Sequence, residues 1–209
     1  MTTARKVASI LLETKAVKLS PEEPFQWSSG WKSPIYCDNR ITLSDVDSRT
    51  FIKKALAKLI KRNFPEAEGI AGVATAGIAQ GALVADYLKL PFAYVRPKPK
   101  EHGMGNQIEG RIETGQKVVV LEDLISTGGS SLKAVEALRT AGVEVIGMIA
   151  IFTYGFKLAD DNFEEYGVTL KTLSNYKFLI DEALKQDYVV QSDVESLKEW
   201  RRNPANWKN

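Results

Sequence analysis

The stretch Val118-Val-Val-Leu-Glu-Asp-Leu-Ile-Ser-Thr-Gly-Gly-Ser130 joins an apolar run to two acids and a pair of glycines. Four consecutive apolar residues at its start are typical of a strand that is buried on both faces of a parallel sheet. We therefore predict a strand over residues 117–122 that ends in Glu122 and Asp123. The glycine pair then turns the chain into a helix over residues 130–141, as in loops that bind anions at a helix N-terminus.

Strands and helices alternate along the rest of the chain, an order that places helices on both faces of a parallel sheet. We predict a Rossmann-like α/β fold in one domain, with a small N-terminal subdomain over residues 1–43 and a core over residues 44–209. The other predicted strands cover residues 69–74, 92–95, 143–152 and 168–173. The other predicted helices cover residues 2–14, 45–63, 78–88, 156–166, 174–185 and 192–202.

The composition is that of a globular protein, because 44% of the 209 residues are hydrophobic and the net charge is only +2. So mild a charge gives little support to nucleic-acid binding. The single cysteine, Cys37, excludes an intramolecular disulfide and predicts a cytoplasmic protein. The most apolar stretch, residues 143–152, is too short to span a bilayer. We therefore expect neither a nucleic-acid nor a membrane partner.

The segment Ser126-Thr-Gly-Gly-Ser130 has the chemistry of a monophosphate site. Its glycines free backbone N–H groups to face one anion, its hydroxyls add donors, and the following helix adds positive potential. The acids Glu122 and Asp123 accept hydrogen bonds from neighbouring hydroxyls, so a sugar phosphate satisfies both halves. An ordinary strand–turn–helix with a capping serine is the alternative. The segment lacks the Gly-Lys-Ser/Thr of a nucleotide-triphosphate loop and the Gly-x-Gly-x-x-Gly of a dinucleotide site.

The connection between residues 96 and 115 is long for a compact domain, and such connections commonly serve as lids or binding loops. It carries Arg96, Lys100 and the single histidine, His102, among glycines that allow it to close. Concentrated cations of this kind suit a polyanion such as pyrophosphate. A solvated basic loop with an incidental histidine is the alternative.

A third segment, Gly69 to Gly81, is a strand that runs through the small-residue turn Ala74-Thr-Ala-Gly77 into a helix. Small side chains permit a ligand to approach the backbone closely. Tight packing between strand and helix explains the same residues equally well, so both interpretations stay open.

Together these segments resemble the type I phosphoribosyltransferases. Val119 to Ser130 is similar to their signature for phosphoribosyl pyrophosphate (PRPP), and Phe25 to Arg40 resembles the N-terminal segment of the orotate phosphoribosyltransferases in particular. The spacing of Arg96, Lys100 and His102 matches the loop of that family as well. The resemblance runs in order from about residue 20 to residue 155. It implies the transfer of a phosphoribosyl group from PRPP to orotate, with release of pyrophosphate.

The resemblance also implies roles for individual residues. Arg96, Lys100 and His102 act in catalysis, and Mg²⁺ is held through PRPP and water without direct protein ligands. The family's loop closes over the neighbouring subunit, which implies a homodimer with shared active sites. Orotate rests on Ser126, Tyr36 and Cys37. PRPP contacts Thr75, Ala76, Arg96, Lys100, His102, Glu122, Asp123, Leu124, Ile125, Ser126, Thr127, Gly128, Gly129 and Ser130.

Several positions depart from relatives that carry a cation there. Pro97 stands where many relatives have a lysine, and Lys98 is the candidate replacement. Ala76 stands where some relatives have a lysine. Tyr154 and Ser28 stand where some relatives have the Arg and Lys that serve the orotate site. Lys32 and Arg40 are the cations that could supply charge instead.

Two rival functions stay open at this point. One is transfer to a different base, a purine or uracil, against which the segment from Phe25 to Arg40 argues. The other is a non-catalytic regulator that binds PRPP and contacts nucleic acid, for which a dense basic face is required and the net charge of +2 gives little support.

Overall fold

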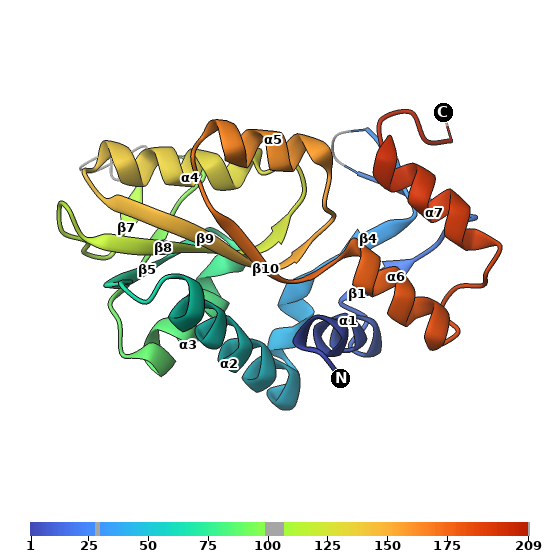
Figure 1. The fold of residues 1–209 in the computed structure, drawn as a ribbon, viewed down its shortest axis with the longest axis horizontal. Coiled ribbons are helices and arrows are strands. Elements are labelled where there is room, and N and C mark those ends of the chain that lie inside the picture. The colour runs from blue at the N-terminus through green and yellow to red at the C-terminus, as the bar shows by residue number, and fades with distance from the viewer. Residues whose placement is uncertain (28–29, 99–106, 209) are drawn as a thin grey trace.

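The computed structural model describes residues 1–27, 30–98 and 107–208. At its centre lies a six-stranded sheet in the order β10-β9-β8-β5-β6-β7 (Figure 1). Neighbouring strands are parallel except at one edge, where β7 runs antiparallel to β6. The strands are β5 (Gly69–Val73), β6 (Phe92–Val95), β7 (Ile108–Glu109), β8 (Lys117–Ile125), β9 (Glu144–Thr153) and β10 (Leu170–Asn175).

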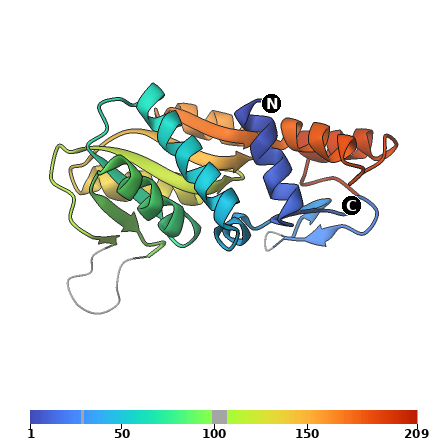
Figure 2. The same ribbon diagram turned by 90° about the horizontal axis from the view of Figure 1, so that it is seen from below.

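Helices cover both faces of this sheet, α1, α2 and α3 on one side and α4 and α5 on the other (Figures 1 and 2). Each face carries its own apolar cluster, because β8 is buried on both sides from Val118 to Leu121. None of the helices in the described ranges is long and apolar enough to cross a membrane. The bounds are α1 (Thr3–Glu13), α2 (Val46–Asn63), α3 (Ala76–Leu88), α4 (Gly129–Thr140) and α5 (Lys157–Glu165).

The N-terminal segment adds two small antiparallel sheets that pack beside the last two helices. Trp200 of the last helix contacts the N-terminal segment. Its indole Nε1 donates to the Lys32 carbonyl at 3.2 Å, and its ring lies edge-on to the Trp27 ring. In one sheet β1 (Val17–Leu19) pairs with β4 (Ile35–Cys37), and in the other β2 (Phe25–Gln26) pairs with β3 (Lys32–Ser33). The 3-10 helix η1 (Asn39–Leu43) follows β4 in the chain. The last two helices are α6 (Tyr176–Lys185) and α7 (Asp193–Arg202).

The α/β fold predicted from the sequence is confirmed, and several boundaries are corrected. Strand β8 continues to Ile125 instead of ending at Glu122, because parallel pairing with β9 persists to the pair Ile125 and Thr153. Helix α3 begins at Ala76, earlier than predicted. The predicted loop from 96 to 115 contains β7, which pairs with the edge strand β6. The division of the domain at residue 43 stays a prediction.

Candidate active site at the carboxyl edge of the sheet

Three of the predicted segments meet at one edge of the sheet. β5, β6 and β8 are parallel neighbours, so the turn after Val73, the connection after Val95 and the loop after Ile125 all leave the sheet at its carboxyl edge. The Ala74 N–H donates to the Val95 carbonyl at 2.9 Å and ties the first two together. Open α/β sheets bind ligands at this edge. Of the predicted site residues, Lys100 and His102 lie outside the described residues, as does Ser28.

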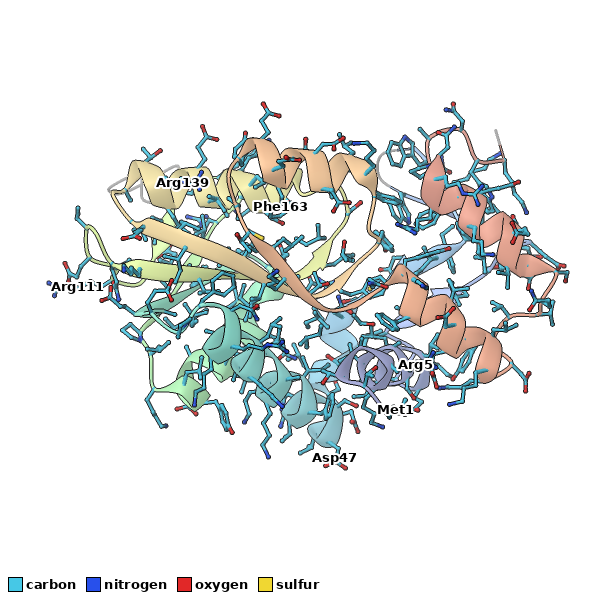
Figure 3. The ribbon with its side chains drawn as sticks, in the orientation of Figure 1. Met1, Arg5, Asp47, Arg111, Arg139 and Phe163 are labelled. Atoms are coloured by element: carbon cyan, nitrogen blue, oxygen red, sulfur yellow. The ribbon has the colours of Figure 1, made fainter. Side chains whose placement is uncertain are left out.

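The loop from Ser126 to Ser130 is shaped for an anion. Gly128 adopts a φ of +83°, and a Cβ there would lie 2.7 Å from the Phe163 ring, so both conformation and space require glycine. Phe163 extends from α5 (Figure 3). Beside it, the Asn162 Nδ2 donates to the Thr127 carbonyl at 2.9 Å and fixes the loop. Gly129 and Ser130 are exposed at the N-terminus of α4, where backbone N–H groups attract negative charge.

Glu122 is the more buried of the two acids, with 6% of its surface exposed. Its Oε1 accepts from the Asp123 backbone N–H at 3.0 Å, and its Oε2 accepts from the Ser131 hydroxyl at 3.1 Å. Burial raises the pKa of Glu122 well above its ordinary value, and the neighbouring Asp123 charge raises it further. The carboxyl group is therefore held in one orientation and resists ionisation.

Asp123 is half-buried beside it, and burial raises its pKa as well. The Asn39 Nδ2 donates to the Asp123 backbone carbonyl at 2.9 Å and so connects β8 to η1. Two adjacent carboxyl groups with raised pKa values favour partners that neutralise or hydrogen-bond them, and the vicinal hydroxyls of a ribose do so.

Leu124 and Ile125 belong to the strand, not to the loop. Ile125 is fully buried within the apolar cluster under α4 and α5, and its carbonyl accepts from the Tyr154 N–H at 3.1 Å. Any contact that Ile125 makes with a ligand must therefore come from its backbone. Leu124 is half-buried against the cluster on the opposite face.

The turn at the start of α3 lies against the end of β8. A Cβ on Gly77 would lie 2.5 Å from the Leu121 carbonyl oxygen, so this position admits only glycine while the helix keeps its place. The Ala74–Thr75 peptide bond is cis. Thr75 is exposed and Ala76 half-buried, and both follow β5 at the same edge of the sheet as the acid pair.

Arg96 stands where the long connection leaves β6. Its backbone N–H donates to the Gln107 carbonyl at 2.9 Å, and the Gln107 Nε2 returns a bond of 2.9 Å to the Arg96 carbonyl. The guanidinium lies 3.8 Å from the Glu109 Oε1, so Gln107 anchors the Arg96 backbone and Glu109 of β7 pairs with its side chain. A hollow of about 860 Å³ lies between this connection and α4, and its lining contains none of the residues predicted to contact PRPP.

Two of the three predicted base-binding residues, Tyr36 and Cys37, lie on β4, next to the acid pair. Tyr36 is 45% exposed, and Cys37 is half-buried with its thiol donating to the Asn39 Oδ1 at 3.4 Å. Burial and the charges of Asp123 and Asp38 raise the pKa of Cys37 well above its ordinary value, so it stays a thiol. Ser126 lies at the end of β8, half-buried.

Positions where relatives carry cations have other partners here. Tyr154 is 2% exposed and lies in an aromatic cluster, stacked on Phe156 and 5.2 Å from the Trp27 ring. Arg40 binds both carboxylate oxygens of Asp38, at 2.7 and 2.9 Å. The Lys32 Nζ donates to the Lys208 carbonyl at 2.7 Å. Lys32 and Arg40, the two cations predicted to supply charge at the orotate site, therefore each have a partner within the chain.

Sequence reasoning missed three polar residues of this site. Each of them donates a hydrogen bond to a predicted site residue. Asn39 donates to Asp123, Ser131 donates to Glu122, and Asn162 donates to Thr127. A single amide or hydroxyl forms no recognisable motif in a sequence. Asn39 and Asn162 are also far in sequence from the residues that they bind, whereas Ser131 is close to Glu122. Only the serine, in the first turn after the loop, could have been suspected.

Comparisons with known proteins agree with this geometry. Residues 47–187 match the phosphoribosyl transferase domain. The chain is 61% identical over 208 residues to the orotate phosphoribosyltransferase of Cytophaga hutchinsonii, covering 100% of both chains, and 60% identical over 207 residues to that of Listeria monocytogenes, covering 99% of both. The crystal structure of the Aeropyrum pernix orotate phosphoribosyltransferase superposes with a TM-score of 0.76 at 30% identity, covering 88% of this chain and 99% of that one. The chain belongs to the orotate phosphoribosyltransferases.

Proposed function

We propose that the chain transfers the phosphoribosyl group of PRPP to orotate in pyrimidine biosynthesis, giving orotidine 5'-monophosphate and pyrophosphate. Full-length identity of 61% to an orotate phosphoribosyltransferase is the observation that carries the proposal. The arrangement of the carboxyl edge supports it, since a phosphate loop and a pair of acids stand side by side there. A single sugar phosphate satisfies both.

Each segment then has a role in one displacement at the ribose C1. The loop from Ser126 to Ser130 holds the 5-phosphate, and Glu122 and Asp123 accept the ribose hydroxyls. Orotate rests on Ser126, Tyr36 and Cys37. Its anionic ring nitrogen forms the new bond to C1 as the bond from C1 to the pyrophosphate oxygen breaks, so no strong base is required.

Charge stabilisation of the departing pyrophosphate is the remaining requirement. Arg96, the backbone of Thr75 and Ala76, and the loop residues Lys100 and His102 serve it in this proposal. Closure of the loop excludes water, which would otherwise hydrolyse PRPP. Lys100 or His102 supplies the proton that pyrophosphate takes up.

The side chains around this site suit a Mg²⁺ ion that is bound mainly through PRPP and water. In the described ranges, no three acidic, cysteine or histidine side chains come together to form a metal site. Mg²⁺ commonly keeps several waters and binds through substrate phosphates and one or two carboxylates, which Glu122 and Asp123 can approach through ribose and water. Bound there, it would neutralise charge on the leaving pyrophosphate.

The test is an assay that follows the absorbance of orotate in the presence of PRPP and Mg²⁺. We expect orotate to be consumed, and chelation by EDTA to lower turnover by about 100-fold or more, because a bound cation contributes several kcal/mol of charge stabilisation. Added Mg²⁺ should restore the rate. Consumption of uracil or a purine in place of orotate would refute the proposal, and consumption of none of them would favour a non-catalytic role.

We propose further that the enzyme is a cytoplasmic homodimer in which the loop of one subunit completes the site of its partner. A mixture of Lys100→Ala and Asp123→Asn chains tests whether each active site takes residues from both subunits. If the two residues serve one site from different subunits, randomly mixed dimers regain about a quarter of native activity, since half of the dimers are mixed and each holds one intact site. The measurement is turnover after unfolding and refolding the two inactive variants together. Activity no higher than that of the separate variants would contradict shared sites.

A further inference from the structure

The Asn39 side chain connects the two substrate-binding segments of the site. It is only 1% exposed, in the first turn of η1. Its Nδ2 donates to the Asp123 carbonyl at 2.9 Å, and its Oδ1 accepts from the Cys37 thiol at 3.4 Å. One amide thus joins β4, assigned to orotate, to the end of β8, assigned to the ribose.

We propose that Asn39 is a positioning residue that sets the separation between the base-binding strand and the ribose-binding acids. The inference rests on the proposed function. Transfer requires the orotate nitrogen and the ribose C1 to approach in line, and a displacement of about 1 Å can cost about 100-fold in rate. Asn39 and Asp123 are 84 positions apart in sequence, and among the described residues no hydrogen bond joins β4 directly to Asp123.

The surroundings make this connection stiff. Asp38 caps the start of η1, because its carboxylate accepts from the Arg40 backbone N–H at 3.1 Å. The buried Thr42 hydroxyl donates to the Asn39 carbonyl at 2.7 Å. The Asn39 amide is therefore fixed at its backbone as well as at both ends of its side chain. A fixed amide keeps the distance between β4 and the end of β8 constant, whereas a mobile amide would allow that distance to vary.

A purely structural role is the competing explanation, and it predicts a different kinetic result. If Asn39 only stabilises η1, its loss reduces the amount of folded enzyme and leaves kcat per folded site unchanged. If it positions the segments, each substrate still binds its own segment but the reacting atoms are misaligned. In that case kcat falls while the affinity for PRPP alone changes little.

The experiment compares Asn39→Ser with Thr42→Val in the full-length enzyme. The serine is too short to reach Asp123 and adds no charge, while Thr42→Val breaks a bond in the same element and keeps both contacts of the Asn39 amide. Three quantities are measured: the thermal midpoint, kcat per folded site with orotate and PRPP, and the dissociation constant of PRPP with Mg²⁺ by calorimetry.

We expect Asn39→Ser to lower kcat by roughly 30- to 100-fold with PRPP affinity within about threefold of native, and Thr42→Val to keep kcat within about twofold at a similar loss of stability. Equal losses of kcat in the two variants, or an unchanged kcat in Asn39→Ser, would overturn the inference. Should Asn39→Ser fail to fold, the uncharged Asn39→Gln, whose amide lies one methylene further from the backbone, carries the same test. If the native enzyme does not transfer the phosphoribosyl group to orotate, the proposed function and this inference are both refuted. If the native enzyme is active and Asn39→Ser has the same kcat, the inference alone is refuted.

Discussion

Replacing Asp123 with asparagine should lower kcat/KM for PRPP by about 100- to 1,000-fold, which corresponds to about 2.7–4 kcal/mol of transition-state stabilisation. Two losses combine in this estimate. A hydrogen bond from a ribose hydroxyl to a carboxylate contributes about 1.5–3 kcal/mol, more than the same bond to an amide. In the proposed reaction the carboxylate also stabilises a ribose C1 that becomes positively charged as pyrophosphate leaves.

Steady-state kinetics at varied PRPP and saturating orotate measure the effect. The matched control is Asp86→Asn, because Asp86 is exposed on α3 and its ion pair with Lys89, at 3.1 Å, is a surface pair of little energetic consequence. We expect that control to stay within about twofold of native. A loss of less than about tenfold in Asp123→Asn would show that the acid pair does not hold the reacting sugar.

The sequence was sufficient to bring together the central segments of the candidate site, because the signal of these segments is local. An apolar run, two acids and a glycine pair follow one another from Val118 to Ser130, and the order of strand, acids, loop and helix forces them to the carboxyl edge of a parallel sheet. The resemblance of Phe25 to Arg40 then identified the base, and the family comparison confirmed that identification.

The remainder depends on contacts between distant parts of the chain. Strand β8 extends to Ile125 because β9 is long enough to pair with it, which the residues of β8 alone do not reveal. The aromatic cluster around Tyr154 needs Trp27 and Trp200, which are 173 positions apart in the chain. The Asn39 contact with Asp123 is of the same kind, so it became visible only in three dimensions.

Replacing Glu122 with glutamine should lower activity and raise stability at the same time. The carboxyl group is buried beside Asp123, and both facts raise its pKa in the folded protein. Glutamine keeps an oxygen for the Asp123 N–H and an amide for the Ser131 hydroxyl, but it carries no charge that burial can penalise. Activity should fall by about 100-fold in kcat/KM for PRPP, since a neutral amide is a poorer acceptor for a ribose hydroxyl.

The sign of the stability effect follows from linkage between proton binding and folding. A pKa raised in the folded state means that the folded protein binds the proton more tightly than the unfolded chain does. The group's favourable contribution is complete below its ordinary pKa of 4.5 and is lost as pH rises toward the folded-state value. At pH 7 native Glu122 therefore costs stability, and Glu122→Gln should recover about 0.5–2 kcal/mol, or roughly 1–8 °C in Tm.

Thermal unfolding of the ligand-free enzyme between about pH 3 and pH 8 distinguishes this account from a general packing effect. The advantage of Glu122→Gln should shrink toward the acid end, where native Glu122 is protonated in both states. Glu182 supplies a control of opposite sign, because the hydrogen bond from Gln186 lowers its pKa. Glu182→Gln should therefore lower Tm at pH 7, and that deficit should diminish on acidification. A lowered Tm for Glu122→Gln at pH 7 would mean that Ser131 and the Asp123 N–H stabilise the carboxylate more than burial and its charged neighbour oppose it.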